Sequence, residues 1–147
     1  MIIRKATRTD IDALSILFDA YRIFYNKPTD INAAKLFLSD RITNNESEIF
    51  LAETIDNKIA GFVQLYPLFS STRLKRLWLL NDLFVAPEYR SQGISVLLID
   101  RAKQLARETN AVALTLETAK SNVIGNALYP KTGFVLDKDH NFYEWEV

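Results

Sequence analysis

Hydrophobic residues in the first third of the chain recur with a helical period. Over residues 11–24, apolar side chains repeat every three or four positions and form one stripe, after a short β-branched opening at 2–6. Thr9 and Asp12 have the spacing of a capping box, so the first helix is expected to begin there. Apolar residues share a face again over 29–42. The pattern therefore predicts one strand followed by two helices.

The period changes to that of β-strands in the middle of the chain. Residues 49–55 and 58–66 are rich in β-branched and aromatic side chains, and turn formers at 56–57 separate them. This arrangement predicts a hairpin. A polar, basic loop is expected at 69–76, before an apolar run at 77–85 that is typical of a central strand.

The remainder of the chain is predicted to alternate between helices and strands. Apolar positions define a clear amphipathic helix over 94–110, and a buried strand is expected over 112–117. A shorter helix is expected over 122–131. Two further strands, at 134–136 and 142–147, complete the pattern.

These elements follow one another in the order β-α-α-β-β-β-α-β-α-β-β. A chain of 147 residues, 48% of them hydrophobic, has the usual size of one domain and can bury a core. No Pro-, Gly- or Ser-rich linker and no repeat marks a boundary. We therefore expect a single α/β domain over residues 1–147, with a mixed, mostly antiparallel central sheet and helices on both faces.

Charge and composition disfavour several classes of function. Lys plus Arg and Asp plus Glu number 18 each, so no net positive field favours nucleic acid or an anionic membrane. The chain has no Cys and one His, His140, which argues against a metal site. No apolar stretch approaches the ~20 residues that span a bilayer, and the expected location is the cytoplasm.

The segment 85–95 joins the strongest predicted strand to the strongest predicted helix. A loop that enters a helix presents unpaired backbone N–H groups and the positive end of the helix dipole, which favours a phosphate oxygen. Gly93 permits close approach of an anion to the backbone, and Arg90 adds positive charge. The alternative is a plain strand-to-helix turn that needs Gly93 only for its backbone conformation.

Other phosphate-binding loops fit the chain poorly. No Gly-Lys-Ser/Thr triplet exists for a P-loop, and four glycines cannot supply a dinucleotide fingerprint. The loop instead resembles that of the GNAT superfamily of N-acetyltransferases, Arg/Gln-x-x-Gly-x-Gly/Ala after a strand that ends Val-x-Pro. The matching residues here are Arg90, Ser91, Gln92, Gly93, Ile94 and Ser95, with Ser95 in place of the usual small apolar residue. This resemblance implies acetyl-coenzyme A as acetyl donor, with its pantetheine arm paired to the backbone of Leu83, Phe84 and Val85.

A second motif extends the resemblance to nearly the whole chain. Residues 122–134 are similar to the family segment Asn-x-x-Ala-x-x-Leu-Tyr-x-x-x-Gly-Phe, with Gly125 in place of Ala and Pro130 in place of the common Glu. The resemblance implies that Tyr129 protonates the departing thiolate and that Asn122 binds pantetheine or caps its helix. From the residues alone, the favoured interpretation is that the Tyr129 ring packs beside Leu128. Gly133 suits the left-handed residue that ends a helix.

Asp82 is the candidate general base, because an acid inside an apolar strand is either paired or functional. An amine must lose a proton before it attacks the thioester, and a carboxylate is a usual acceptor for that proton. Asn81 and Glu117 are the alternative polar residues of a substrate site. A structural hydrogen bond from Asp82 to a neighbouring loop is the competing interpretation.

The expected function is transfer of an acetyl group to a primary amine. Residues 80–85 and 66–71 resemble a subgroup related to diamine and histone-type acetyltransferases. That resemblance implies a small cationic acceptor, such as a polyamine or amino acid, or a protein lysine. The aromatic C-terminal strand offers area for a homodimer, and the alternative is that it belongs to the core of the chain. The alternative is a non-catalytic acyl-coenzyme A sensor or interaction module.

Overall fold

The computed structural model describes all residues from 1 to 147. The chain divides into two compact units, Met1–Leu116 and Glu117–Val147, which we describe one at a time. The organisation of residues 1–147 as a single domain stays a prediction.

The first unit contains a five-stranded sheet in the order β1-β2-β3-β4-β5. Neighbouring strands from β1 to β4 are antiparallel, whereas β5 runs parallel to β4. The sheet is therefore mixed and mostly antiparallel, as predicted. Its strands are β1 (Ile2–Lys5), β2 (Glu48–Glu53), β3 (Ile59–Ser70), β4 (Lys75–Val85) and β5 (Leu114–Thr115).

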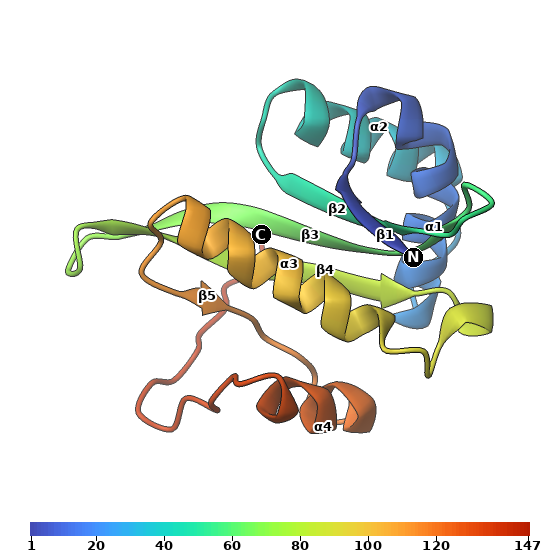
Figure 1. Cartoon of the computed structure of the whole chain (residues 1–147). Coiled ribbons are helices and arrows are strands. Elements are labelled where there is room, and N and C mark those ends of the chain that lie inside the picture. Colours follow the sequence, from blue (N-terminus) through green and yellow to red (C-terminus); the bar gives the residue numbers. More distant parts are fainter. The chain divides into compact units, whose positions relative to one another are not determined.

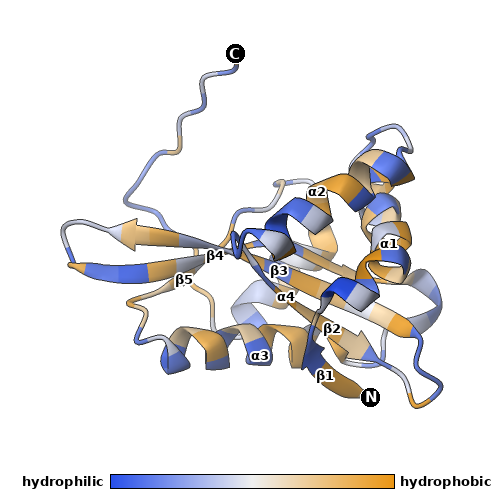
Figure 2. Cartoon of the chain, turned by 90° about the horizontal axis from the view of Figure 1, so that it is seen from above, coloured by the Kyte–Doolittle hydropathy of each residue, from blue (hydrophilic) through white to orange (hydrophobic).

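Helices cover both faces of this sheet (Figure 1). On one face, α1 (Ile11–Phe24) and α2 (Ile31–Thr43) bury Ile49 and Leu51 of β2 in a common core. On the other face lies α3 (Ile94–Glu108), where the Arg101 guanidinium sits 4.1 Å from the ring centre of Phe50. Because successive strand residues point to opposite faces, this alternation along β2 separates the two layers. Figure 2 shows α3 with its hydrophobic side toward the sheet and its hydrophilic side outward.

The first helix begins differently from the sequence prediction. The capping interaction joins Thr7 and Asp10, not Thr9 and Asp12: the backbone N–H and the hydroxyl of Thr7 both donate to Asp10 Oδ2, at 2.7 and 2.9 Å. A 3₁₀ turn, Arg8–Asp10, precedes α1, which starts at Ile11. Both pairs have the same spacing. Asp10 is selected because it also reaches a cation on β1.

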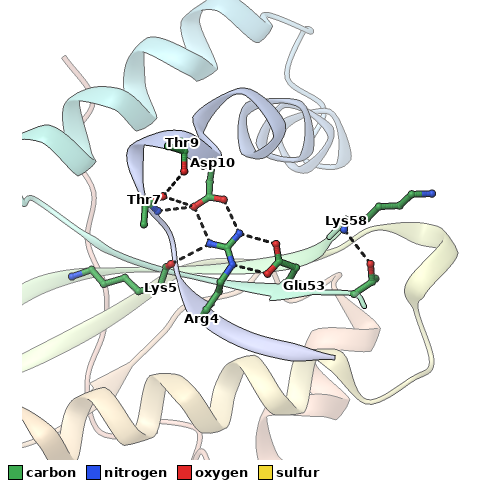
Figure 3. A network of polar contacts seen from close by, with 8 residues as sticks. Arg4, Lys5, Thr7, Thr9, Asp10, Glu53 and Lys58 are labelled. Atoms are coloured by element: carbon green, nitrogen blue, oxygen red, sulfur yellow. Dashed lines mark hydrogen bonds and ion pairs between the residues drawn. The ribbon is translucent and has the colours of Figure 1, made fainter. Parts of the chain in front are cut away.

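That cation is Arg4, which binds two carboxylates at once (Figure 3). Its guanidinium makes two hydrogen bonds to Asp10, at 2.7 and 2.9 Å, and two to Glu53 on β2, at 2.7 and 2.9 Å. Hydrogen bonding by Arg4 holds the pKa of Asp10 at about 2 and lowers the pKa of Glu53. The network ties the chain entering α1 to two strands of the sheet.

Half of the predicted polar loop over 69–76 is strand in the structure. β3 continues to Ser70 and β4 starts at Lys75, so only residues 71–74 form the turn of a long hairpin. The Arg76 guanidinium lies 5.3 Å from the ring centre of Phe69 and 5.1 Å from that of Trp78. Two strands that pair with each other but face solvent do not need a run of apolar residues. The sequence pattern therefore did not predict the hairpin ends of β3 and β4.

The second unit contains one helix, α4 (Val123–Lys131). The Asn122 side chain caps it by accepting from the Gly125 N–H at 3.0 Å. Pro130 does not end the helix early, because it lies in the last turn, and Gly133 has the expected left-handed conformation, with φ 88°.

The predicted strands at 134–136 and 142–147 are absent, and the strand predicted over 112–117 is reduced to the two residues of β5. A strand requires a neighbour to pair with its backbone groups, and no strand of the chain pairs with these residues. The prediction of two C-terminal strands was therefore wrong for the isolated chain.

Candidate active site

The C-terminal half of β4 has one open backbone edge. On one side β4 pairs with β3 through Leu83, Phe84 and Val85. On the other side β5 pairs only with Trp78 and Leu79. The backbone beyond Leu79 thus presents N–H and C=O groups that an extended ligand can pair with, as an added strand would.

This open edge leads into a turn whose backbone N–H groups have no acceptor. Ser91 and Gly93 both have positive φ, 60° and 75°, and Gly93 precedes the first residue of α3. None of the described hydrogen bonds uses the N–H groups of residues 91–95. A Cβ atom at Gly93 would find no other atom within 4 Å, so the space beside these amides is open. Five unpaired N–H groups at the positive end of a 15-residue helix are chemically suited to phosphate oxygens.

Arg90 packs beside this turn. Its Nε donates to the Val85 carbonyl at 3.0 Å, and its guanidinium lies 5.5 Å from the ring centre of Phe84 and 5.9 Å from that of Phe24. These contacts fix the turn against the end of β4. None of the ion pairs of the chain involves Arg90, so its charge has no acidic partner.

Asp82 lies on β4 with only 4% of its surface exposed. Gln64 Nε2 donates to Asp82 Oδ2 at 2.7 Å, and Asn81 Nδ2 donates to Asp82 Oδ1 at 3.0 Å. Gln64 in turn accepts from the Ser47 hydroxyl at 2.9 Å. Burial raises the pKa of Asp82, and hydrogen bonds from Gln64, Tyr21 and Asn81 oppose that rise.

A β-bulge places Asn81 next to this acid. Gln64 pairs with Asp82 and Leu65 pairs with Leu80, so Asn81 has no partner on β3. Asn81 is exposed, and its backbone carbonyl oxygen accepts a hydrogen bond from the Tyr21 hydroxyl at 3.5 Å. Bulges re-aim side chains and are frequent beside active sites.

A mainly apolar pocket of about 460 Å³ lies between α1 and α2. Tyr21 connects it to the acid, because its ring lines the pocket and its hydroxyl hydrogen-bonds to Asp82. The pocket also presents two cations, Arg22 and Lys27. Arg22 is paired with the buried carboxylate of Asp19 at 3.2 Å, whereas Lys27 has no acidic partner. The lining residues are Phe18, Tyr21, Arg22, Tyr25, Lys27, Ala33, Ala34 and Phe37.

Three of the expected site residues lie in the second unit. Tyr129 is half-buried, with its ring 5.8 Å from that of Phe134, and Glu117 is exposed. Asn122 caps α4 and donates from Nδ2 to Thr118 Oγ1 at 2.9 Å. The first unit therefore brings Asn81, Asp82 and residues 83–95 together, and the places of these three beside them stay predictions.

Sequence reasoning did not identify Tyr21, Gln64 or Ser47. Gln64 is a polar residue inside an apolar strand, which is the same signal that singled out Asp82. Tyr21 lies in the apolar stripe of α1 and carries no pattern of its own.

The mixed sheet, the open backbone edge of β4 and the turn with unpaired amides before α3 fit the acyltransferase class that the sequence motifs indicate. The chain belongs to the acetyltransferase (GNAT) family, whose profile matches residues 12–134.

Relatives agree with this membership along nearly the full chain. YhfO of Bacillus subtilis, an uncharacterized N-acetyltransferase, is 42% identical over 137 residues, which are 93% of this chain and 91% of YhfO. A probable acetyltransferase of Haemophilus influenzae is 33% identical over 140 residues, 95% and 94% of the two chains. The crystal structure of a probable acetyltransferase has a TM-score of 0.96 at 39% identity, covering 100% of this chain and 98% of the other.

Proposed function

We propose that this GNAT acetyltransferase transfers the acetyl group of acetyl-coenzyme A to the primary amine of a small amino-acid-like molecule, with Asp82 as the base. The observation that carries the proposal is the link through Tyr21, which joins a buried carboxylate to a mainly apolar, cation-bearing pocket. Family membership supports the reaction, and the site geometry supports the assignment of residues.

The residues present fit acetyl-coenzyme A. The free N–H groups of residues 91–95 would hold its diphosphate, and the open edge at Leu83, Phe84 and Val85 would pair with its pantetheine arm. When bound, it supplies the acetyl thioester. The absence of a side chain at Gly93 keeps the approach to the amides open.

Asp82 is suited to accept the proton of the incoming amine. Its raised pKa brings the carboxylate closer to the pKa of an amine than an exposed Asp would be, which favours proton transfer near neutral pH. Tyr21 positions the amine beside this acid because the same residue touches both the pocket and the carboxylate. Tyr129 is proposed to protonate the departing thiolate, the role implied by its place in the family motif.

The charges of the pocket favour an acceptor with an anionic group. Lys27 lacks an acidic partner, and the one carboxylate beside Arg22, that of Asp19, is buried and already bound by Thr29 and the Asp30 N–H, at 2.6 and 2.9 Å. A polyamine would meet the unpaired charge of Lys27 here, whereas a carboxylate would pair with it. The aromatic walls suit an apolar body. Of the amines left open by the sequence, an amino-acid-like acceptor fits best.

The test is a spectrophotometric assay of thiol release from acetyl-coenzyme A with matched acceptors. An aromatic amino acid, its methyl ester and a polyamine present the same reacting group with different charge. We expect the free acid to be the best substrate and Lys27→Gln to reduce its advantage over the ester by about tenfold, the value of one charge-assisted contact. Lys35→Gln, on an exposed lysine outside the pocket, is the control. Equal rates for acid and ester in the wild-type protein contradict the assigned acceptor class, and no release with any amine contradicts the catalytic assignment.

The expected surroundings of the protein stay proposals. No helix of the chain is both long and apolar enough to cross a bilayer. We propose a cytoplasmic location, without nucleic-acid partners.

A further inference from the structure

Two polar side chains, those of Ser47 and Gln64, are buried in the first unit beside the proposed base. Gln64 has no exposed surface, and Ser47 is 8% exposed. The neighbours of Gln64 along β3, Val63 and Leu65, are apolar and also have no exposed surface. Burial of an amide costs free energy unless its polar atoms are hydrogen-bonded, and an apolar side chain avoids this cost. Packing alone thus does not explain a glutamine at this position.

Gln64 is the middle member of a buried chain of hydrogen bonds. The Ser47 hydroxyl donates to Gln64 Oε1 at 2.9 Å, and Gln64 Nε2 donates to Asp82 Oδ2 at 2.7 Å. Both contacts join side chains, so the pair does not cap a helix or close a turn. No buried side-chain oxygen or nitrogen of the chain lacks a partner. The hydrogen bonds of this pair are therefore directed to the acid.

The strand register places Gln64 directly beside Asp82. These two residues pair across β3 and β4, and the next pair is Leu65 with Leu80, so the bulge at Asn81 follows at once. Asp82 Oδ2 is bound by the fully buried Gln64, whereas Oδ1 accepts from the exposed Asn81 at 3.0 Å. The carboxylate is thus anchored from its buried side, and its other side is the one that an acceptor can approach.

We propose that Gln64 is a positioning residue for acetyl transfer, which holds the Asp82 carboxylate by its Oδ2 atom, and that Ser47 supports it by binding the far end of the amide. The inference rests on the proposed function, because Gln64 acts only through Asp82 as the base. A catalytic group needs neighbours that fix its orientation, since a small displacement costs a large factor in rate. A charge-assisted hydrogen bond is also about twice as strong as a neutral one, so the contact favours the charged, proton-accepting form of Asp82.

Other titratable groups of the first unit that lie near the acid do not titrate in acidic solution. Tyr66 follows Gln64 by two residues on β3 and points to the same face. Burial and the charge of Asp82 raise the pKa of Tyr66, and Arg41 of α2 opposes that rise. Tyr21 contributes a hydroxyl from α1. No ion pair includes Asp82, and phenols and guanidinium groups keep their protons below about pH 9. A change in the acidic limb therefore reports on the acid itself.

The first experiment compares the pH dependence of kcat/KM, from thiol release, in three proteins. Gln64→Met keeps the length of the side chain and removes the donor. Because the lost hydrogen bond favoured the charged acid, the pKa of the base rises, and the acidic limb should move up by about one pH unit. Gln64→Glu sets a second carboxylate against the first, and two buried carboxylates share one proton, so its limb should move further. Wild-type limbs in both variants overturn the proposal.

Matched controls separate this role from a structural one. Leu65→Met introduces the same side chain at the neighbouring buried position, on the opposite face of β3, and should keep the wild-type limb. Ser47→Ala should move the limb as Gln64→Met does, but by less. Ser15→Ala removes a buried hydroxyl that donates to the Asp12 carbonyl at 2.9 Å, and should not move it. Thermal melts that change while every limb stays in place mean a structural role, and contradict the inference.

The second experiment distinguishes a failure of this inference from a failure of the proposed base. At a pH below the acidic limb, Gln64→Met should lower kcat/KM by about tenfold, the equivalent of one pH unit. In an Asp82→Asn background it should cause no further loss, because Gln64 acts through Asp82. Losses that multiply in the double variant contradict the positioning role. An Asp82→Asn protein with the wild-type rate contradicts the base, and the inference with it. An inactive Asp82→Asn protein beside an unaltered Gln64→Met protein contradicts the inference alone.

Discussion

The two units of the chain differ in how completely each covers its own apolar residues. Met1–Leu116 builds a core in which Leu14, Leu38 and Phe62 have no exposed surface. In Glu117–Val147 only Gly125 is buried, and most of the large apolar residues face solvent. The first unit therefore has the packing of a self-sufficient fold, whereas the second covers little of its apolar surface with its own residues. Each prediction below strengthens or breaks this contrast.

The largest effect should come from removing the buried acid of the first unit. Asp82→Asn is expected to lower kcat/KM by about 10²–10⁴-fold, because it deletes the proposed base. It should keep its thermal midpoint at neutral pH, since Asn fits the same space and removes a buried charge. The wild-type rate should fall on acidification through a pKa above 3.8, because the base must be deprotonated. Steady-state thiol-release kinetics and thermal melts measure both quantities.

The control is Asp100→Asn, on the exposed side of α3. Tyr129→Phe provides the parallel test in the second unit, with an expected loss of at least about 10²-fold. An Asp82→Asn protein with undiminished activity would show that Asp82 is not the base.

The next effect compares one residue type in the two units. Phe62→Ala should lower the free energy of unfolding by about 3–5 kcal/mol at any protein concentration, because it opens a cavity in the core. Phe142→Ala should change it by less than about 0.5 kcal/mol, because that ring is exposed. Urea unfolding measures the free energy of unfolding of both variants. Equal losses in the two variants would show that the Phe142 ring is packed as tightly as that of Phe62.

An intermediate effect is expected at the phosphate-binding turn. Gly93→Glu places a carboxylate in the open space beside the free amides and should raise the Kd for acetyl-coenzyme A by about 10–100-fold, the cost of losing one charged hydrogen-bonded contact. Calorimetric titration measures it. Gln104→Glu adds the same charge on an exposed site of α3 and should leave Kd nearly unchanged. Similar weakening by both variants would indicate a general charge effect and not a local site.

The smallest effect concerns the acid stability of the first unit. In Arg4→Gln the pKa of Asp10 should rise from about 2 toward 3.8, because the guanidinium no longer stabilises the carboxylate. The depressed pKa stabilises the fold above about pH 4, and this contribution is lost as pH falls from about 4 to about 2. The variant lacks this contribution and should unfold at higher pH on acidification. NMR titration of the carboxyl resonances tests the pKa, and an unchanged Asp10 would contradict the network.

The elements with local signals could be read from the sequence. Gly93 adopts a positive φ before α3, and Asp82 is buried, as expected for an acid in an apolar strand. Each of these follows from residue type and nearby spacing.

The failures are all non-local. The choice of Thr7 and Asp10 over Thr9 and Asp12 depends on Arg4, which only the folded β1 brings near. The strand pattern of residues 142–147 is clear, but a pattern cannot show which edge it pairs with. Tyr21 reaches Asp82 from a helix that packs on the sheet, and the residues next to Tyr21 in the sequence do not predict that contact.

The side chain of Gln64 can form a hydrogen bond with both the charged and the protonated form of Asp82. Its amide lies between the Ser47 hydroxyl and the Asp82 carboxylate, at 2.9 and 2.7 Å. Rotation of the amide by half a turn exchanges its donor and acceptor, and the serine hydroxyl can donate or accept. A charged Asp82 accepts a hydrogen bond from the Gln64 NH₂ group, and a protonated Asp82 can donate to the Gln64 carbonyl oxygen after the amide has rotated. Both charge states thus use one set of heavy-atom positions, so the structural reorganisation that accompanies each proton transfer is small.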